Sequence, residues 1–207
     1  MEAARQPTAP LPTSAPTGRV GDVHEAALTL FARWGYHGTT MSQIAEALGV
    51  RVPTLYSHIR SKQELLAEIM TTGAERVWAD YERAIDGAEG VTEQLRRAVE
   101  VYVHRHATKR REALIHNRDI SSLEEPTRSE VLALRKRHQH AIRDLIDEGC
   151  AAGVFAVENS TVASFAILEM GVSVARWFRD DGPLTPDDVA RQYGQFAVSL
   201  VSRPAAP

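Results

Sequence analysis

Apolar residues recur along this chain every three or four positions, the period of an α-helix, and the alternation typical of strands is nearly absent. The best candidate for a strand is the short stretch 153–157. Caps and breaks divide the helical pattern into segments at about 19–34, 41–48, 52–59, 61–85, 92–117, one after Pro126 that ends near 152, 160–179 and 185–201. We therefore predict an all-α protein.

Two of these helices are short and stand close together, at 41–48 and 52–59. Thr40 and Gln43 have the spacing of a capping box, in which each side chain satisfies a free backbone amide at the helix start. Gly49 supplies the left-handed residue that ends this helix, and Pro53 is tolerated in the first turn of the next. Two short helices around a tight turn, packed between longer ones, predict a helix-turn-helix unit.

The second short helix has an outer face without acidic residues. Because Leu55 and Ile59 face inward, the residues that point outward are Pro53, Thr54, Tyr56, Ser57 and Arg60. Ordinary solvated helix faces mix both signs of charge, whereas this one offers no repulsion to phosphates. Such a face suits the major groove of DNA.

Charge supports this hypothesis only locally. The chain carries 24 Lys and Arg against 27 Asp and Glu, a net charge of −3, so the protein as a whole would repel a polyanion. Arg51, Arg60 and Lys62 nevertheless lie at or beside the second short helix. Lys62 falls in the first turn of a helix, where free amides already attract an anion, and we expect a phosphate there. A merely solvated helical surface is the alternative.

The run from Thr40 to Leu65 resembles the signature of the TetR family of bacterial transcriptional regulators. The resemblance implies phosphate contacts from Thr40, Tyr56 and Lys62. It implies that base edges are read from among Ser42, Val52, Pro53, Thr54 and His58. Arg51 departs from the family, which usually has Ser or Thr at this cap: either the cap is weaker, or Arg51 binds a phosphate or a guanine. The resemblance implies a ligand-responsive regulator, in most cases a repressor.

The pattern divides the chain into a disordered tail at 1–18, a helix-turn-helix domain at 19–66, an effector-binding and dimerisation domain at 67–202 and a loose tail at 203–207. The stretches 122–128, 145–155 and 175–188 are similar to the C-terminal domain of KstR-like members of the family. Several of those respond to coenzyme A (CoA) thioesters of fatty acids or sterol fragments. The resemblance therefore implies a small hydrophobic effector, with a drug-responsive efflux regulator as the alternative.

Candidate ligand-binding residues lie on the helices that would surround a cavity. They are Tyr102, Arg105, Phe165, Met170 and Trp177, although aromatic residues and Met at helical spacing also suit a plain core. Arg105 belongs to a basic stretch of the 92–117 helix, which is either a solvated face or a contact for CoA phosphates. We expect the 61–85 helix to transmit ligand binding to the DNA, since it joins Lys62 to Met70 and Val77.

The last two helices carry more apolar residues than one bundle face needs, which predicts a homodimer closed by four helices. The candidate interface residues are Leu168, Val172, Ala175, Phe178, Phe196 and Leu200.

Other classes of protein find little support in the residues. The chain has no nucleophile elbow, phosphate loop or zinc-protease motif, so we expect no enzyme and no cofactor. An adaptor that binds only protein would leave the absence of acidic residues on the outer face of the 52–59 helix unexplained. Histidine pairs two residues apart point about 200° apart on a helix and predict no metal site. No apolar stretch approaches the roughly 20 residues of a membrane span. The single cysteine, Cys150, fits a reducing cytoplasm.

Overall fold

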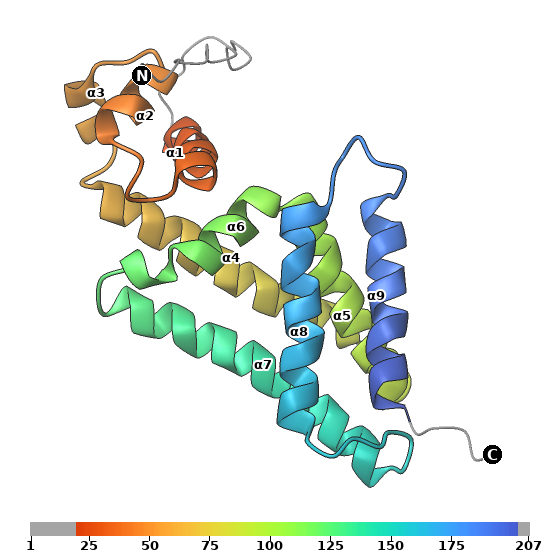
Figure 1. Cartoon of the computed structure of the whole chain (residues 1–207). Coiled ribbons are helices and arrows are strands. Elements are labelled where there is room, and N and C mark those ends of the chain that lie inside the picture. The colour runs from red at the N-terminus through yellow and green to blue at the C-terminus, as the bar shows by residue number, and fades with distance from the viewer. Residues whose placement is uncertain (1–19, 203–207) are drawn as a thin grey trace, which may run out of the picture.

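The computed structural model describes residues 20–202, and the predicted tails at 1–18 and 203–207 lie outside this range. The described residues form an all-α fold, which confirms the predicted class (Figure 1). Its helices are α1 (Val20–Trp34), α2 (Met41–Ala47), α3 (Val52–Tyr56), α4 (Lys62–Ile85), α5 (Val91–Thr108), α6 (Arg110–Arg118), a 3-10 turn η1 (Ile120–Ser122), α7 (Thr127–Ala151), α8 (Ser160–Trp177) and α9 (Pro186–Val201). The strand candidate at 153–157 contributes only a single β-bridge, between Phe155 and Ser202.

The helix-turn-helix unit begins as its caps predict. The Thr40 hydroxyl accepts a hydrogen bond from Gln43 N at 3.2 Å, and the Gln43 amide oxygen accepts one from Thr40 N at 2.8 Å. Ser61 caps α4 in the same way by accepting from Glu64 N at 3.0 Å. Helix α3 is shorter than predicted and ends at Tyr56, where the backbone hydrogen bonds from Ser57 N to Thr54 O and from His58 N to Leu55 O join residues three apart, and the chain turns before the extended Ser61.

The prediction of a single helix over 92–117 is wrong. Lys109 leaves the helical region with φ −112° and ψ 41° and separates α5 from α6. Neither Gly nor Pro marks the break. Contacts from distant parts of the chain hold α6 at both ends: Arg110 donates to Ala175 O at 3.2 Å, and Arg118 donates to the last carbonyls of α1. The direction of α6 is therefore set by tertiary contacts rather than by a local signal.

Helix α4 joins the two halves of the molecule, as Figure 1 shows. One core cluster unites α1–α3 with the start of α4 and continues through Ile115, Leu123 and Val131 of the C-terminal half. The other surrounds α5, which packs against α4, α7, α8 and α9. The predicted domain boundary after residue 66 therefore falls within a continuous helix and a continuous core.

Candidate functional site

Helix α3 presents a polar outer surface. Leu55 is fully buried, while Pro53, Thr54, Tyr56 and Ser57 are exposed, Tyr56 by 50% of its surface. His58 follows in the turn and is also exposed, whereas Val52 is half-buried against the core of the unit. The surface thus offers hydroxyl, phenol and imidazole groups and no carboxylate from α3 itself, groups that can form hydrogen bonds to phosphates and base edges.

Arg51 and the start of α2 extend this surface. Arg51 is the N-cap residue of α3, yet its side chain makes no capping hydrogen bond and is exposed. The guanidinium is therefore not used in capping α3. Thr40 and Ser42 are exposed at the start of α2, although the Thr40 hydroxyl is already engaged in the capping box.

Lys62 holds the loop between α1 and α2. Its ammonium donates to Tyr36 O at 2.9 Å and to Thr39 O at 2.8 Å, and it lies 4.2 Å from the centre of the Tyr36 ring. The Tyr36 hydroxyl in turn donates to Gln63 Oε1 at 2.8 Å. Burial lowers the pKa of Lys62. Two of the three ammonium donors are thus used in hydrogen bonds within the protein, and the third is outside these two bonds.

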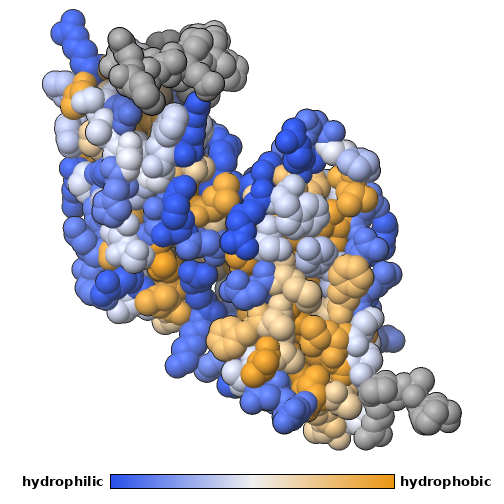
Figure 2. All heavy atoms as spheres, in the orientation of Figure 1, coloured by the Kyte–Doolittle hydropathy of each residue, from blue (hydrophilic) through white to orange (hydrophobic). Residues whose placement is uncertain are grey.

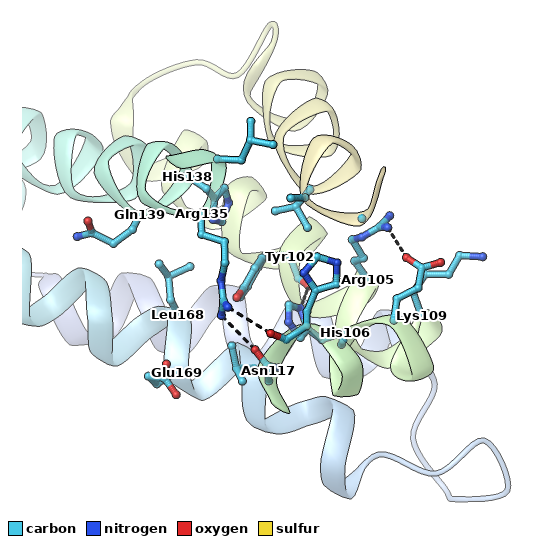
Figure 3. A pocket seen from close by; sticks show the side chains of 18 of the residues that line it. Tyr102, Arg105, His106, Lys109, Asn117, Arg135, His138, Gln139, Leu168 and Glu169 are labelled. Atoms are coloured by element: carbon cyan, nitrogen blue, oxygen red, sulfur yellow. Dashed lines mark hydrogen bonds and ion pairs between the residues drawn. The ribbon is translucent and has the colours of Figure 1, made fainter. Parts of the chain in front are cut away.

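A cavity of about 330 Å³ lies in the C-terminal half, between α4, α5, α6, α7 and α8 (Figure 3). This volume is at the lower end of the range for small-molecule sites. The apolar part of its lining includes Ala74, Val77, Ala113, Leu132, Leu134, Phe165, Leu168 and Val172. The polar part includes Tyr102 and the imidazoles of His106, His116 and His138.

Basic residues surround the cavity, and they differ in how they are paired. Arg105 is mostly buried and binds Asp80 at 3.1 Å and Glu112 at 2.7 Å, so its charge is neutralised within the protein. Lys109, Arg135 and Lys136 are exposed and have no acidic partner in the part of the chain described. Arg135 instead donates to His116 O and to Asn117 Oδ1, at 3.3 and 3.2 Å. The unpaired positive charge therefore comes from Lys109 and from α7, and Glu169 of α8 adds an exposed carboxylate to the same lining.

The imidazoles of the cavity are neutral at pH 7, because burial lowers the pKa of His106, His116 and His138 to about 4. His106 Nδ1 donates to Tyr102 O at 2.8 Å. The rings of His106 and His138 pack on Tyr102, with centroids 4.3 and 5.0 Å away. The wall they form is polar but uncharged.

Comparison with known proteins finds a family match for the helix-turn-helix unit and another for the half that holds the cavity. Residues 24–69 match the family described as "Bacterial regulatory proteins, tetR family", and residues 88–201, more than half of the chain, match "Tetracyclin repressor-like, C-terminal domain". The chain belongs to the TetR family. The sequence resemblance is thereby confirmed, and this TetR-family member is a transcriptional regulator rather than an enzyme.

Individual TetR-family proteins are similar over nearly the whole chain. The HTH-type transcriptional repressor KstR2 of Mycolicibacterium smegmatis is 28% identical over 192 residues, which cover 89% of this chain and 91% of that protein. The structure of PfmR from Thermus thermophilus is 32% identical with a TM-score of 0.77, over 87% of this chain and 99% of the other. The structure of AibR with isovaleryl coenzyme A and operator DNA is 25% identical with a TM-score of 0.75, over 88% and 97%.

The structure separates the predicted ligand residues of this TetR-family chain. Tyr102, Arg105 and Phe165 line the cavity, whereas Met170 packs against the core of the C-terminal half. Trp177 lies on the outer surface, with its ring 6.4 Å from that of Tyr193. At 100° per residue, Met170 and Trp177 lie roughly 140° and 120° around α8 from Phe165, so the placement of these two at the cavity is wrong. Lys109 belongs to the basic stretch for which a contact with CoA phosphates was one of two interpretations. Arg135, Lys136 and the cavity histidines were missed, because no local pattern distinguishes them from residues of a solvated or buried helix face.

The predicted dimer residues of the TetR-family chain fall into two groups. Ala175 and Phe178 are buried in the core, and Leu168 and Val172 are buried against the cavity, so these four do not belong to an exposed surface. Phe196 and Leu200 are 49% and 43% exposed. We name the apolar surface that they form with Val162 and Trp177 the α8–α9 face, and Figure 2 shows apolar side chains gathered over these helices.

Helix α6 lies between the cavity and the helix-turn-helix unit. Ala113, His116 and Asn117 line the cavity. Arg118 donates to Phe31 O and, at 3.3 Å, to Ala32 O, which are carbonyls at the end of α1. A cation at a helix C-terminus also meets the negative end of the helix dipole. A displacement of α6 would therefore reach α1 directly.

No helix in residues 20–202 has the length and hydropathy of a membrane span. The same residues contain no cluster of three or more His, Cys, Asp or Glu able to hold a metal ion.

The buried histidines predict a pH-dependent stability. In the unfolded chain each takes up a proton near pH 6.5, whereas in the folded protein His106, His116 and His138 do so only near pH 4. The unfolded state binds more protons in this window, so stability is retained above pH 6.5 and lost as the pH falls towards 4, by up to ~1.4 kcal/mol per pH unit for each histidine.

Urea unfolding between these pH values measures this slope. His138→Phe should remove about one third of it, while Tyr193→Phe, which removes no histidine and lies outside the cavity lining, should leave it unchanged. An unaltered slope in His138→Phe would contradict the assignment.

Proposed function

We propose that this chain is a homodimeric repressor that binds a pseudo-palindromic operator and releases it when an acyl-CoA thioester binds. One observation carries the proposal: a cavity whose lining is apolar in part and includes unpaired basic residues is joined by α6 to the helix-turn-helix unit. The similarity to KstR2, a repressor, supports repression rather than activation.

The DNA contacts follow from the exposed residues of the helix-turn-helix unit. A two-fold dimer would present two copies of α3 to successive major grooves, about 34 to 36 Å apart. We assign phosphate contacts to Thr40, Tyr56 and the remaining donor of Lys62. Base contacts come from among the exposed Ser42, Pro53, Thr54 and His58, the half-buried Val52 and Arg51, whose guanidinium is free to bind a guanine.

The acyl group of the effector would lie in the cavity, and its CoA nucleotide would lie at the cavity rim. A cavity of about 330 Å³ holds an acyl group but not the nucleotide of CoA, so the phosphates would lie outside, near Lys109, Arg135 and Lys136. The same charges oppose a cationic drug, which disfavours the efflux regulator. The structure of AibR was determined with an acyl-CoA and operator DNA, which supports this class of effector.

Coupling between the two sites would pass through α6. An acyl group that moves Ala113 or His116 would displace Arg118 and with it the end of α1. The proposed dimer forms through the α8–α9 face, which would otherwise expose large apolar side chains to water. A regulator of this kind acts in the cytoplasm, where the DNA is.

Fluorescence anisotropy on DNA from upstream of the protein's own gene tests the proposal. We expect octanoyl-CoA to weaken the complex about 5- to 150-fold, which corresponds to a coupling of about 1 to 3 kcal/mol. The double variant Lys109→Gln, Lys136→Gln should bind octanoyl-CoA several-fold more weakly, because each lost charge removes a phosphate contact.

Arg143→Gln, on α7 but outside the cavity lining, is the matched control and should behave as the wild type. The proposal fails if no acyl-CoA of any chain length alters the complex while hydrophobic cations do.

A further inference from the structure

The cavity wall is more polar than a hydrocarbon chain requires. Tyr102 from α5 and His138 from α7 both line it, and Figure 3 shows them beside each other. Gln139 joins them and donates to Ser164 Oγ at 2.8 Å, a bond that is itself buried. A site shaped only for an alkyl chain would have apolar residues at these positions.

Two polar groups of this wall lack partners. Nε2 of His138 is buried without a hydrogen-bond partner in the described part of the chain. The Tyr102 hydroxyl also has no hydrogen-bond partner among the described residues, but it is less enclosed than His138 Nε2, because Tyr102 is only half-buried. Burial raises the pKa of this hydroxyl. Gln139, by contrast, has its partner in Ser164. A buried polar group without a partner destabilises the fold, and such groups gather where a ligand supplies the missing atom.

The aromatic neighbours of His138 fix its ring. Tyr102 stacks on it with an interplanar angle of 28°, and Tyr81 meets it edge-on at 5.6 Å between centroids. The ring therefore cannot turn away to find another partner without breaking both contacts. His116 Nε2 is also unpartnered, but a methyl group built at Gly73 would lie only 2.3 Å from it, so α4 closes off that nitrogen.

The charge state of the wall restricts what it can bind. Because the pKa of His138 is lowered to about 4, its imidazole is neutral at pH 7 and offers one donor and one acceptor nitrogen. A carboxylate beside this ring would have to draw a proton onto it, or lose its hydration with only the cations at the cavity edge, such as Arg135, as counter-charge. A neutral oxygen carries no such cost, and both imidazole and phenol can donate to it or accept from it.

We propose that the cavity recognises a neutral oxygen function, a hydroxyl or a ketone, on the acyl group of the effector, through Tyr102 Oη and His138 Nε2. This inference rests on the proposed function and narrows it to oxygenated acyl groups over plain hydrocarbon ones. The thioester oxygen is common to all acyl-CoA molecules, so it cannot account for a preference between them.

Calorimetric titration of the full chain with matched ligands tests the inference. The probes are octanoyl-CoA and a series in which one hydroxyl or one ketone is placed at successive carbons of the octanoyl group. We expect at least one oxygenated member to bind about tenfold more tightly than octanoyl-CoA, the effect of satisfying one buried polar group. His138→Phe and Tyr102→Phe, which keep the ring shapes, should each reduce this preference to less than about threefold.

Matched controls show whether the effect belongs to His138 and Tyr102 or follows the removal of a polar atom from any His or Tyr ring. His140→Phe and Tyr193→Phe alter residues outside the cavity lining and should retain the preference. If octanoyl-CoA binds as tightly as every oxygenated member, the inference is overturned while the proposed function stands. If no member of the series binds the wild type at all, the proposed function itself fails. A preference that persists in both His138→Phe and Tyr102→Phe also overturns the inference.

Discussion

Replacing Trp177 and Phe196 together by glutamate should convert the protein from a dimer into a folded monomer and weaken operator binding by 100-fold or more. Both side chains lie on the α8–α9 face and are 45% and 49% exposed in the single chain, so the substitution leaves no hole in the core. In the dimer these side chains would be buried, and burying unpaired carboxylates costs several kcal/mol. A monomer also loses the gain from occupying two half-sites at once.

Sedimentation velocity measures the oligomeric state, and anisotropy on the operator measures the affinity. Leu184→Glu is the matched control, because Leu184 is 45% exposed in the loop between α8 and α9 and outside the face as defined. Its dimer and its operator affinity should equal those of the wild type. A double variant that stays dimeric would show that the interface lies elsewhere on the chain.

The helix-turn-helix unit was predictable because its signals are local. A capping box needs only residues three positions apart, and Thr40 with Gln43 forms one as predicted. The buried positions of α2 and α3, such as Ile44 and Leu55, follow equally from helical spacing. The role of Lys62 was harder to predict, because the carbonyls that it holds belong to residues 23 and 26 positions earlier in the chain.

The C-terminal half was less predictable because α8 is apolar on most of its circumference. Leu168, Phe178 and Trp177 look alike in a sequence, yet one lines the cavity, one lies in the core and one is exposed. Periodicity reports that a face is buried, and does not report whether protein, ligand or a partner subunit buries it. The break between α5 and α6 has no local signal either, so the position of Lys109 at the edge of the cavity could not be predicted.

The break has a functional consequence, since α6 reaches α1 only because it diverges from α5. The sequence indicated α4 as the route from the effector to the DNA, and α4 does run from Lys62 to the cavity residues Ala74 and Val77. Helix α6 offers a second route, in which the forked guanidinium of Arg118 holds two carbonyls of α1 and also contacts the buried Asp119 at 2.9 Å. The two routes can be separated by a substitution that retains the charge of Arg118 and removes the fork.

Arg118→Lys should bind octanoyl-CoA as tightly as the wild type, yet its operator affinity should fall less than about threefold when the effector is added, against about 5- to 150-fold in the wild type. The ammonium keeps a positive charge beside Asp119, so the fold survives, but it cannot hold Phe31 O and Ala32 O together as the guanidinium does. Because coupling is reciprocal, operator DNA should also lose its effect on octanoyl-CoA affinity, which calorimetry measures independently. Arg128→Lys, whose ion pair with Glu125 lies outside α1, should keep the full response. Full release by the effector in Arg118→Lys would instead assign the coupling to α4.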